Sequence, residues 1–315
     1  MTNAAETLIL HHYAMSPFSE KVRVILGLKS AQWRGCDQPV VMPKDALLVL
    51  TGGYRRIPVL QIGADLYFDT TRIIDEIERR VPLPSAYAGV GRGMASAVTG
   101  WTDAWAGQPG LFWTGVVALF SGDFDVAEDP AFAADRAALL GMPFDGAAMM
   151  AALPETERQL RGCLDLLERQ LGDGRQFLFG SQLDIADAGA FHTINFLRYG
   201  RGRNVRILEE FPGLLAWEAR VRAVGHGFRG EDVSREEAIA IARAATPAPL
   251  ERKSVHADLP SGTAIRLSYN DANTPPLDAV LLAADHQFMS VSPATSQVGD
   301  LVIHMPYSTA RISKR

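Results

Sequence analysis

Two hydroxyl side chains, Ser16 and Ser19, occupy positions where their surroundings suggest sulfur chemistry. Residues 14–23 read AMSPFSEKVR, and cysteines in place of both serines would give C-P-F-C, the two-thiol pattern of disulfide-exchanging helices. A serine cannot exchange disulfides, but its hydroxyl donates a hydrogen bond to a thiolate. The free N–H groups and the dipole of a helix N-terminus favour the same negative charge. The segment therefore suits a site that holds and ionises the thiol of a ligand.

Ser16 also has a purely structural interpretation. A serine before Pro17, which is favoured in the first helical position, is a common helix N-cap and contributes about 1 kcal/mol. Tyr13 lies at the end of an apolar run at 7–14, and its structural interpretation is an ordinary aromatic side chain at the end of a strand.

The elements that must position these hydroxyls follow the order βαβαββα over about 80 residues. The two hairpin strands flank Gly63-Ala64, where glycine suits the first position of a type II′ turn. The expected elements are a strand at 7–14, a helix from Ser16, a strand at 31–41, a helix at 43–50, a hairpin at 57–68 and a helix at 70–80.

The Pro- and Gly-rich stretch at 81–93 predicts a domain boundary, and helical periodicity dominates from 94 to about 245. Asp184 and Asp187 predict a capping box at the start of one of these helices. The basic run at 198–206 is expected to form a solvated loop between helices, since no aromatic-rich or groove-reading motif surrounds it. Contact with phosphate is the alternative. The expected helices span 94–107, 111–121, 130–141, 154–172, 184–199 and 212–224.

The composition is that of a soluble globular protein. The 315 residues suffice for two or three domains, 47% are hydrophobic, and the net charge of −5 comes with no nucleic-acid-binding pattern. Cys36 and Cys163 provide no disulfide framework. His11 and His12 point to opposite faces of a strand, and no further metal-ligand pattern accompanies them. Without a membrane-spanning run or a signal peptide, the sequence predicts a cytoplasmic enzyme or binding protein.

Four motifs together resemble the glutathione transferase family. SPFSEKVR at 16–23 is similar to the serine-type active-site segment of that family, and RRIPVL at 55–60 to its Ile-Pro segment. YFDTTRII at 67–74 is similar to its acid-plus-hydroxyl segment, which usually carries Glu-Ser. FLFGSQLDIADAGAF at 177–191 is similar to a helix start in the all-helical domain of the family. The four motifs follow one another in the order of the family.

The resemblance implies a fold of at least two parts. Residues 1–82 would form an α/β thioredoxin-like N-terminal domain that binds glutathione, and residues 93–245 the all-α C-terminal domain of the family. Residues 248–315 lie outside the resemblance. Their short β-prone segments, separated by turn residues, predict an extra small β-rich domain, a sheet or barrel of unknown role. A homodimer is a further expectation from the resemblance.

The resemblance implies glutathione as a co-substrate, and no metal. Ser16 would hold the glutathione thiolate, with Tyr13 as the alternative hydroxyl. In the family the proline at the position of Pro58 follows a cis peptide bond, which leaves the backbone of Ile57 free to pair with the cysteinyl unit of the ligand. The alternative for Pro58 is an ordinary proline of an edge strand.

The charged ends of glutathione also need partners. The Thr70 hydroxyl and the free N–H groups of a helix start would hold the γ-glutamyl carboxylate. Asp69 would face the neighbouring ammonium group, or would only cap the helix, and it is shorter than the usual Glu. Lys44, Arg55 or Arg56 would pair with the glycyl carboxylate, although each is equally open as a solvated surface charge.

The implied function is that of a transferase of alkyl or aryl groups, in which the glutathione thiol attacks a small hydrophobic electrophile. Conjugation, glutathione-dependent ether cleavage, dehalogenation and isomerisation all fit. Trp101, Trp105, Phe112 and Trp113 would line the electrophile pocket or would belong to the core. The alternative is a non-catalytic binding or assembly module on the same scaffold, which the strand-rich appendage favours.

The two serines predict that dithiol chemistry is absent. The protein should not reduce mixed disulfides as a glutaredoxin does, because neither Ser16 nor Ser19 can form a disulfide. A reduction assay with a glutathione mixed disulfide measures this on the wild-type protein. Robust turnover would contradict the prediction and would direct attention to Cys36, the cysteine of the N-terminal region.

Overall fold

The chain passes back and forth between two structural units, and neither unit is a continuous stretch of sequence. The computed structural model describes residues 7–105, 107–250, 253–271 and 273–315. A sheet unit combines Met1–Ala14, Gln32–Arg80 and Phe228–Arg315, and a helical unit combines Met15–Ala31 and Val81–Gly227. Among the residues described, none of the helices has both the length and the apolar character that crossing a membrane requires.

The sheet unit is built on one mixed sheet whose strand order is β10-β6-β7-β8-β9-β4-β3-β1-β2-β5. The pairs β1–β2, β2–β5 and β4–β9 are parallel, and the other neighbours are antiparallel. The strands are β1 (Leu8–His12), β2 (Gln32–Asp37), β3 (Val59–Ile62), β4 (Asp65–Phe68), β5 (Phe228–Arg229), β6 (Ala264–Tyr269), β7 (Leu277–Ala284), β8 (Phe288–Pro293), β9 (Val302–Pro306) and β10 (Ala310–Lys314).

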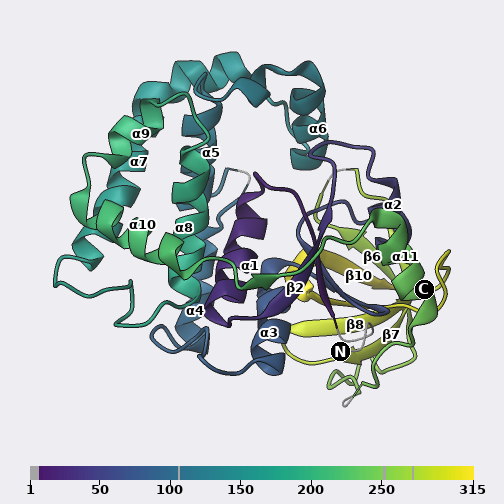
Figure 1. The fold of residues 1–315 in the computed structure, drawn as a ribbon. Helices are drawn as coiled ribbons and strands as arrows, with labels where there is room; N and C mark the ends of the chain where they lie inside the picture. Colours follow the sequence, from purple (N-terminus) through teal and green to yellow (C-terminus); the bar gives the residue numbers. More distant parts are fainter. Residues whose placement is uncertain (1–6, 106, 251–252, 272) are drawn as a thin grey trace. The chain divides into compact units, whose positions relative to one another are not determined.

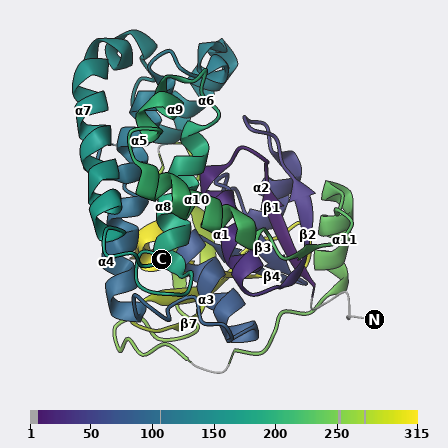
Figure 2. The same ribbon diagram turned by 60° about the vertical axis from the view of Figure 1, so that its left-hand side comes forward.

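Helices α2 (Asp45–Thr51) and α11 (Arg235–Ala244) both contribute to the main hydrophobic core of this unit, so they cover the same face of the sheet (Figures 1 and 2). Helix α3 (Thr70–Arg80) follows β4 directly and buries its isoleucines, as the sequence predicts. A short 3-10 turn, η3 (Tyr307–Thr309), separates β9 from β10. The hairpin β3–β4 turns at Gly63, whose φ of 59° fits the expected type II′ turn.

The C-terminal extension forms β6 to β10, and these strands continue the N-terminal sheet instead of making a sheet or barrel of their own. The junction is the pair β4–β9, in which Leu66 lies opposite Ile303. An uncovered β4 would expose a row of unpaired N–H and C=O groups, which β9 satisfies. Leu66, Ile303 and Met289 then belong to one common core. Residue patterns predict the strands themselves, but not the partner that each strand chooses.

One buried carboxylate, that of Asp65, holds both the entry to the extension and its strand β9. Its Oδ2 accepts the N–H of Ala248 at 2.8 Å, and its Oδ1 lies 2.9 Å from His304 Nε2. Tyr67 stacks on the His304 ring with centroids 4.4 Å apart. Burial lowers the pKa of His304, although the hydrogen bond to Asp65 acts in the opposite direction. The folded protein therefore favours a neutral imidazole here.

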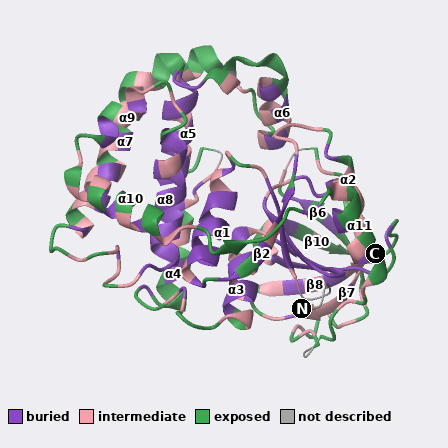
Figure 3. Cartoon of the chain, in the orientation of Figure 1, coloured by how far each residue is buried: buried purple, intermediate pink, exposed green. Residues whose placement is uncertain are grey.

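The helical unit is arranged around α8, which is buried along nearly its whole length and packs against α1, α4 and α5 (Figure 3). The predicted capping box at its start is confirmed, since Asp184 and Asp187 each accept a backbone N–H. The elements are α1 (Pro17–Leu28), α4 (Arg92–Thr102), α5 (Leu111–Phe120), the 3-10 helix η2 (Asp125–Glu128), α6 (Pro130–Leu140), α7 (Gly146–Gln170), α8 (Ile185–Leu197), α9 (Arg203–Leu208) and α10 (Pro212–Val224).

Helix α7 starts eight residues before its expected beginning at 154. Asp145 caps it by accepting the N–H of Ala148, and Pro154 lies inside the helix. The expected start coincides with Pro154, and proline is common in the first position of a helix. Proline interrupts one hydrogen bond inside a helix, and packing of this long helix against α5 and α10 compensates.

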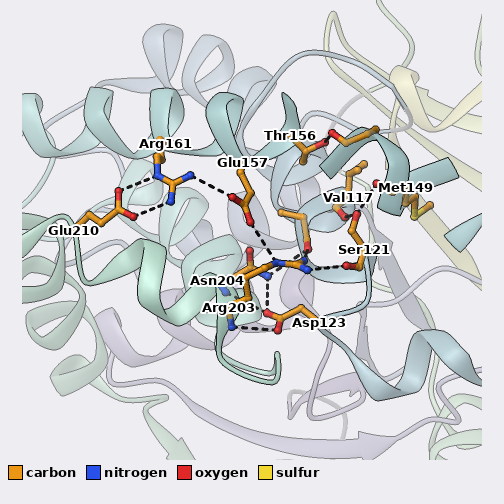
Figure 4. Close-up of polar contacts among 12 residues, drawn as sticks. Val117, Ser121, Asp123, Met149, Thr156, Glu157, Arg161, Arg203, Asn204 and Glu210 are labelled. Atoms are coloured by element: carbon orange, nitrogen blue, oxygen red, sulfur yellow. Dashed lines mark hydrogen bonds and ion pairs between the residues drawn. The ribbon is translucent and has the colours of Figure 1, made fainter. Parts of the chain in front are cut away.

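The basic run at 198–206 is not the solvated loop that the sequence predicts, because its second half forms α9 and Arg198, Arg201 and Arg203 pair with carboxylates. Arg198 makes two hydrogen bonds to Glu218 on α10. Figure 4 shows Asp123 accepting the backbone N–H groups of Arg203 and Asn204 as well as the Asn204 amide. These carboxylates lie 20 to 81 positions away in the sequence, so no local pattern reveals them.

Asp65→Asn should loosen the extension from the sheet. The substitution keeps the size of the side chain but removes the charge that two hydrogen bonds share, so we expect a loss of about 1.5–3 kcal/mol in the free energy of unfolding. Urea denaturation measures it. Asp278→Asn is the matched control, because Asp278 pairs with Arg266 at a more exposed place on the same extension. Equal stability of the two variants would contradict the anchoring role of Asp65.

Candidate functional site

Ser16 and Ser19 form one hydrogen-bonded pair at the start of α1. Ser16 is the N-cap residue, and its Oγ accepts the backbone N–H of Ser19 at 3.2 Å and the Ser19 hydroxyl at 2.9 Å. Both side chains are buried. Because Ser16 Oγ accepts twice, its own hydroxyl hydrogen is available to a further acceptor. The capping and thiol-holding interpretations are therefore compatible: one oxygen caps the helix and its hydrogen can serve a ligand.

Cys36, the thiol of the N-terminal region, lies on β2 in the sheet unit. It is fully buried, and Gln38 Nε2 donates to its sulfur at 3.3 Å. Burial raises the pKa of Cys36 to about 11. The thiol therefore stays protonated at neutral pH, and its environment is that of a structural cysteine.

Aromatic side chains gather beside the serines within the helical unit. The Phe18 ring lies 4.7 Å from Phe112, 5.1 Å from His192 and 5.8 Å from Trp105, measured between centroids. Trp105 and Phe112 stack with an interplanar angle of 9°. Phe112 and His192 are buried, whereas Phe18 and Trp105 stay partly exposed. The cluster thus presents part of two aromatic faces next to the start of α1.

A buried charge cluster fixes helix α1 through Lys21, Asp103 and His192. Lys21 Nζ, on α1, lies 2.6 Å from Asp103 Oδ2 and is fully shielded from solvent. His192 Nε2, on α8, lies 3.1 Å from the other carboxylate oxygen. Burial disfavours the ionised carboxyl, but the Lys21 charge and the His192 hydrogen bond outweigh it and hold the pKa of Asp103 well below its usual range. Burial also lowers the pKa of His192.

The expected peptide-binding residues lie in the sheet unit. The Ile57–Pro58 peptide bond is cis, as the family resemblance implies. Asp69 adopts a positive φ of 69°, which Asp tolerates better than most residues, and its Oδ1 accepts the N–H of Thr71 at 2.8 Å. Asp69 therefore caps α3, while Thr70 begins that helix and is 6% exposed.

The three candidate cations differ in their surroundings. Lys44 Nζ lies 5.5 Å from the centre of the Tyr13 ring, so these two predicted residues are neighbours in the sheet unit. Arg55 is buried. Arg56 donates to the Asn270 carbonyl at 2.8 Å and lies 3.5 Å from Asp271 Oδ2, so the extension engages its guanidinium. Among the described residues no group of His, Cys, Asp and Glu is arranged to hold a metal.

Two domain descriptions of one family match the chain. The glutathione S-transferase N-terminal domain matches residues 10–85, and the glutathione S-transferase C-terminal domain matches residues 150–220. The chain belongs to the glutathione S-transferase family. The first match covers the motifs around Ser16, Pro58 and Thr70, and the second covers the capping box of α8.

Individual proteins that are similar to this chain extend the comparison. A GST-like protein from Pseudomonas syringae is 29% identical, with a TM-score of 0.79 and coverage of 98% of this chain and 100% of its own. Glutathione S-transferase U13 from Arabidopsis thaliana is 26% identical over 217 residues, which are 66% of this chain and 83% of that protein. The Tau class enzyme from mango, Mangifera indica, shares the fold at 17% identity, with a TM-score of 0.51 over 69% of this chain and 89% of its own. The Pseudomonas match includes the extension, which the two domain descriptions do not reach.

Sequence reasoning missed several residues around the candidate site. Ser19 was read only as a lost sulfur, although its spacing from Ser16 is that of a capping hydrogen bond. Lys21, Asp103 and His192 carried no signal, because a charge on a predicted helix is usually solvated. Only the packing of α1, α4 and α8 shows that the three meet out of water.

Asp103→Asn should destabilise the helical unit strongly. Removing the carboxylate leaves the Lys21 ammonium buried without its charged partner, so we expect a loss of about 3–5 kcal/mol in the free energy of unfolding. Thermal or urea unfolding measures it. Lys21→Met combined with Asp103→Asn should be less damaging than the sum of the two single changes. Glu155→Gln removes an exposed pair with Arg158 and should have no measurable effect. Strict additivity of the first two changes would contradict the pairing.

Proposed function

We propose that this protein binds reduced glutathione and ionises its thiol for attack on a small hydrophobic electrophile. The observation that carries the proposal is the Ser16–Ser19 pair at the N-terminus of α1. Ser19 occupies the acceptor capacity of Ser16, and this orients the Ser16 hydroxyl as a donor. A donor at a helix N-terminus stabilises a thiolate more than a thiol. The fold and the relatives support a glutathione transferase-like function in general.

The energy that this activation needs is within reach of the site. A free thiol has a pKa of about 8.5, and lowering it by about two units takes roughly 2.7 kcal/mol of preferential thiolate stabilisation. One hydrogen bond to a charged acceptor supplies about 1.5–3 kcal/mol, and the helix terminus adds to it. The proton leaves to solvent, and the thiolate is the nucleophile. Tyr13 remains the second candidate hydroxyl, and its ring has Lys44 as a neighbour.

The peptide part of glutathione is assigned to the sheet unit. The backbone of Ile57, before Pro58, would pair with the cysteinyl unit. The N-terminus of α3, with the Thr70 hydroxyl, would hold the γ-glutamyl carboxylate. The capping bond of Asp69 to Thr71 uses one carboxylate oxygen and leaves the other for the ligand ammonium.

The electrophile is assigned to the aromatic cluster of the helical unit. Phe18 and Trp105 are partly exposed, and such flat faces suit an aromatic or otherwise apolar group. Conjugation, ether cleavage, dehalogenation and isomerisation share this thiolate chemistry and differ in the electrophile. A homodimer and a cytoplasmic location stay predictions from the family. A non-catalytic binding module is the alternative, and the retained donor pair at Ser16 favours the enzyme.

Ser16→Ala should change the chemistry of the bound thiol and affect its capture only slightly. The Ser16 hydroxyl acts on the thiolate, so the pKa of bound glutathione should rise by about one unit or more, while its affinity stays within a few-fold. Titration of thiolate absorbance in the complex measures the pKa. Ser234→Ala is the matched control, because Ser234 is also an N-cap serine and accepts the Glu237 N–H at 3.0 Å.

Thr70→Ala should behave in the opposite way to Ser16→Ala. Thr70 would contact the charged end of the ligand, so its removal should weaken glutathione binding by about 1.5–3 kcal/mol and leave the thiol pKa unchanged. Calorimetry gives the affinity. If Ser16→Ala and the wild type titrate together, Ser16 is only a helix cap and the proposed mechanism is wrong.

A further inference from the structure

The C-terminal extension contacts the segment that precedes Pro58 through the Arg56 side chain. Arg56 donates from Nη2 to the Asn270 carbonyl, and its Nε lies 3.5 Å from Asp271 Oδ2. The Asp271 side chain is only 1% exposed, whereas that of Arg56 is 31% exposed. A buried carboxylate facing a half-buried guanidinium restricts where the guanidinium can go. The extension therefore constrains Arg56 directly.

A column of aromatic rings makes a second connection within the same unit. Tyr54 stacks on Phe68 with centroids 4.3 Å apart and an interplanar angle of 8°. Tyr269, at the end of β6, also contacts Tyr54, with centroids 5.2 Å apart and an interplanar angle of 50°. Phe68 is the residue directly before Asp69. The extension thus contacts Tyr54, which in turn supports the start of α3, where the γ-glutamyl group is assigned.

The turn after α2 fits closely against the extension. Gly52 and Gly53 have φ values of 65° and 104°. A Cβ on Gly52 would lie 2.8 Å from Leu277 Cδ1, and one on Gly53 would lie 3.2 Å from Pro275 Cγ. The Thr51 hydroxyl is within 2.7 Å of the Tyr54 carbonyl, which ties this turn to the aromatic column. Residues 51–56 are therefore held on several sides by a segment that lies more than 200 positions later.

We propose that the extension holds the peptide-binding part of the glutathione site in place, with Asp271 as a positioning residue that acts through Arg56. This inference rests on the proposed function. Asp271, Tyr269 and Leu277 hold residues 52–56 and the start of α3 in the form that accepts the peptide. Arg56 then serves as the link to the extension and not as the partner of the glycyl carboxylate.

The decisive comparison uses Asp271→Asn and Arg56→Gln in the full chain, with glutathione affinity measured by calorimetry. Each change should weaken binding by about five- to tenfold, and the double variant should be no weaker than either single variant, because the two side chains act as one unit. Asp278→Asn, which breaks the pair with Arg266 elsewhere in the extension, is the matched control and should bind as the wild type does.

γ-Glutamylcysteine, which lacks the glycine of glutathione, tests whether Arg56 positions the site or contacts the glycyl carboxylate directly. The variants should lose affinity for γ-glutamylcysteine by the same factor as for glutathione, since the extension would position Ile57 and the start of α3, which are assigned to the cysteinyl and γ-glutamyl units. If Arg56→Gln weakens only glutathione while Asp271→Asn binds as tightly as the wild type or tighter, Arg56 is a direct ligand and the inference is overturned.

A measurement without ligand keeps the inference distinct from the proposed function. Amide hydrogen exchange at residues 52–56 of the ligand-free protein should be faster in Asp271→Asn than in Asp278→Asn. Unchanged exchange would overturn the positioning role. A wild-type protein that binds no glutathione would refute both the proposed function and the assignment of the peptide-binding residues. Faster amide exchange at residues 52–56 in Asp271→Asn would still establish that the extension holds this segment.

Discussion

The pairing of β4 on both of its edges is the constraint on which the sheet unit depends. On one side β3 lies antiparallel to it, directly after Pro58, and on the other side β9 of the extension lies parallel to it. Its last residue, Phe68, precedes Asp69 and the start of α3. The hydrogen bonds of one four-residue strand therefore connect the assigned peptide-binding residues to a segment more than 200 positions away. Asp65, at the start of the same strand, adds a side-chain hydrogen bond between β4 and β9 through His304.

In the helical unit the corresponding constraint is the position of the start of α1, which has few polar contacts at that end of the helix. The Ser16–Ser19 pair joins residues three positions apart and needs no contact with a distant segment. Its orientation depends on α1, and α1 is fixed by Lys21 through Asp103 and His192. A buried ion pair seldom adds net stability over apolar packing, but it restricts how helices can be arranged. The cluster thus serves geometry at the serines more than overall stability.

The two serines also bear on the proposed thiol-holding role, because they occupy both sulfur positions of a disulfide-exchange pattern. Sulfur at both positions would form a bond to the ligand and break it again, whereas two hydroxyl groups can only make hydrogen bonds. One hydroxyl saturates the other, and a single donor hydrogen is left at the helix N-terminus. The same local backbone therefore supports a different chemistry after the exchange of one atom in each side chain.

The sequence by itself determined what depends on neighbouring residues. The order of β1 to α3, the turn at Gly63, the capping box of Asp184 and Asp187, and the N-cap role of Ser16 all follow from local pattern and spacing. The tertiary structure alone decided that β9 pairs with β4, that α9 forms in the basic run, and that Arg56 faces Asp271. Strand pairing and charge pairing join residues that are far apart in the chain, and backbone groups are chemically alike in every strand. Which partners meet is therefore settled by the packing of the whole unit and not by any local segment.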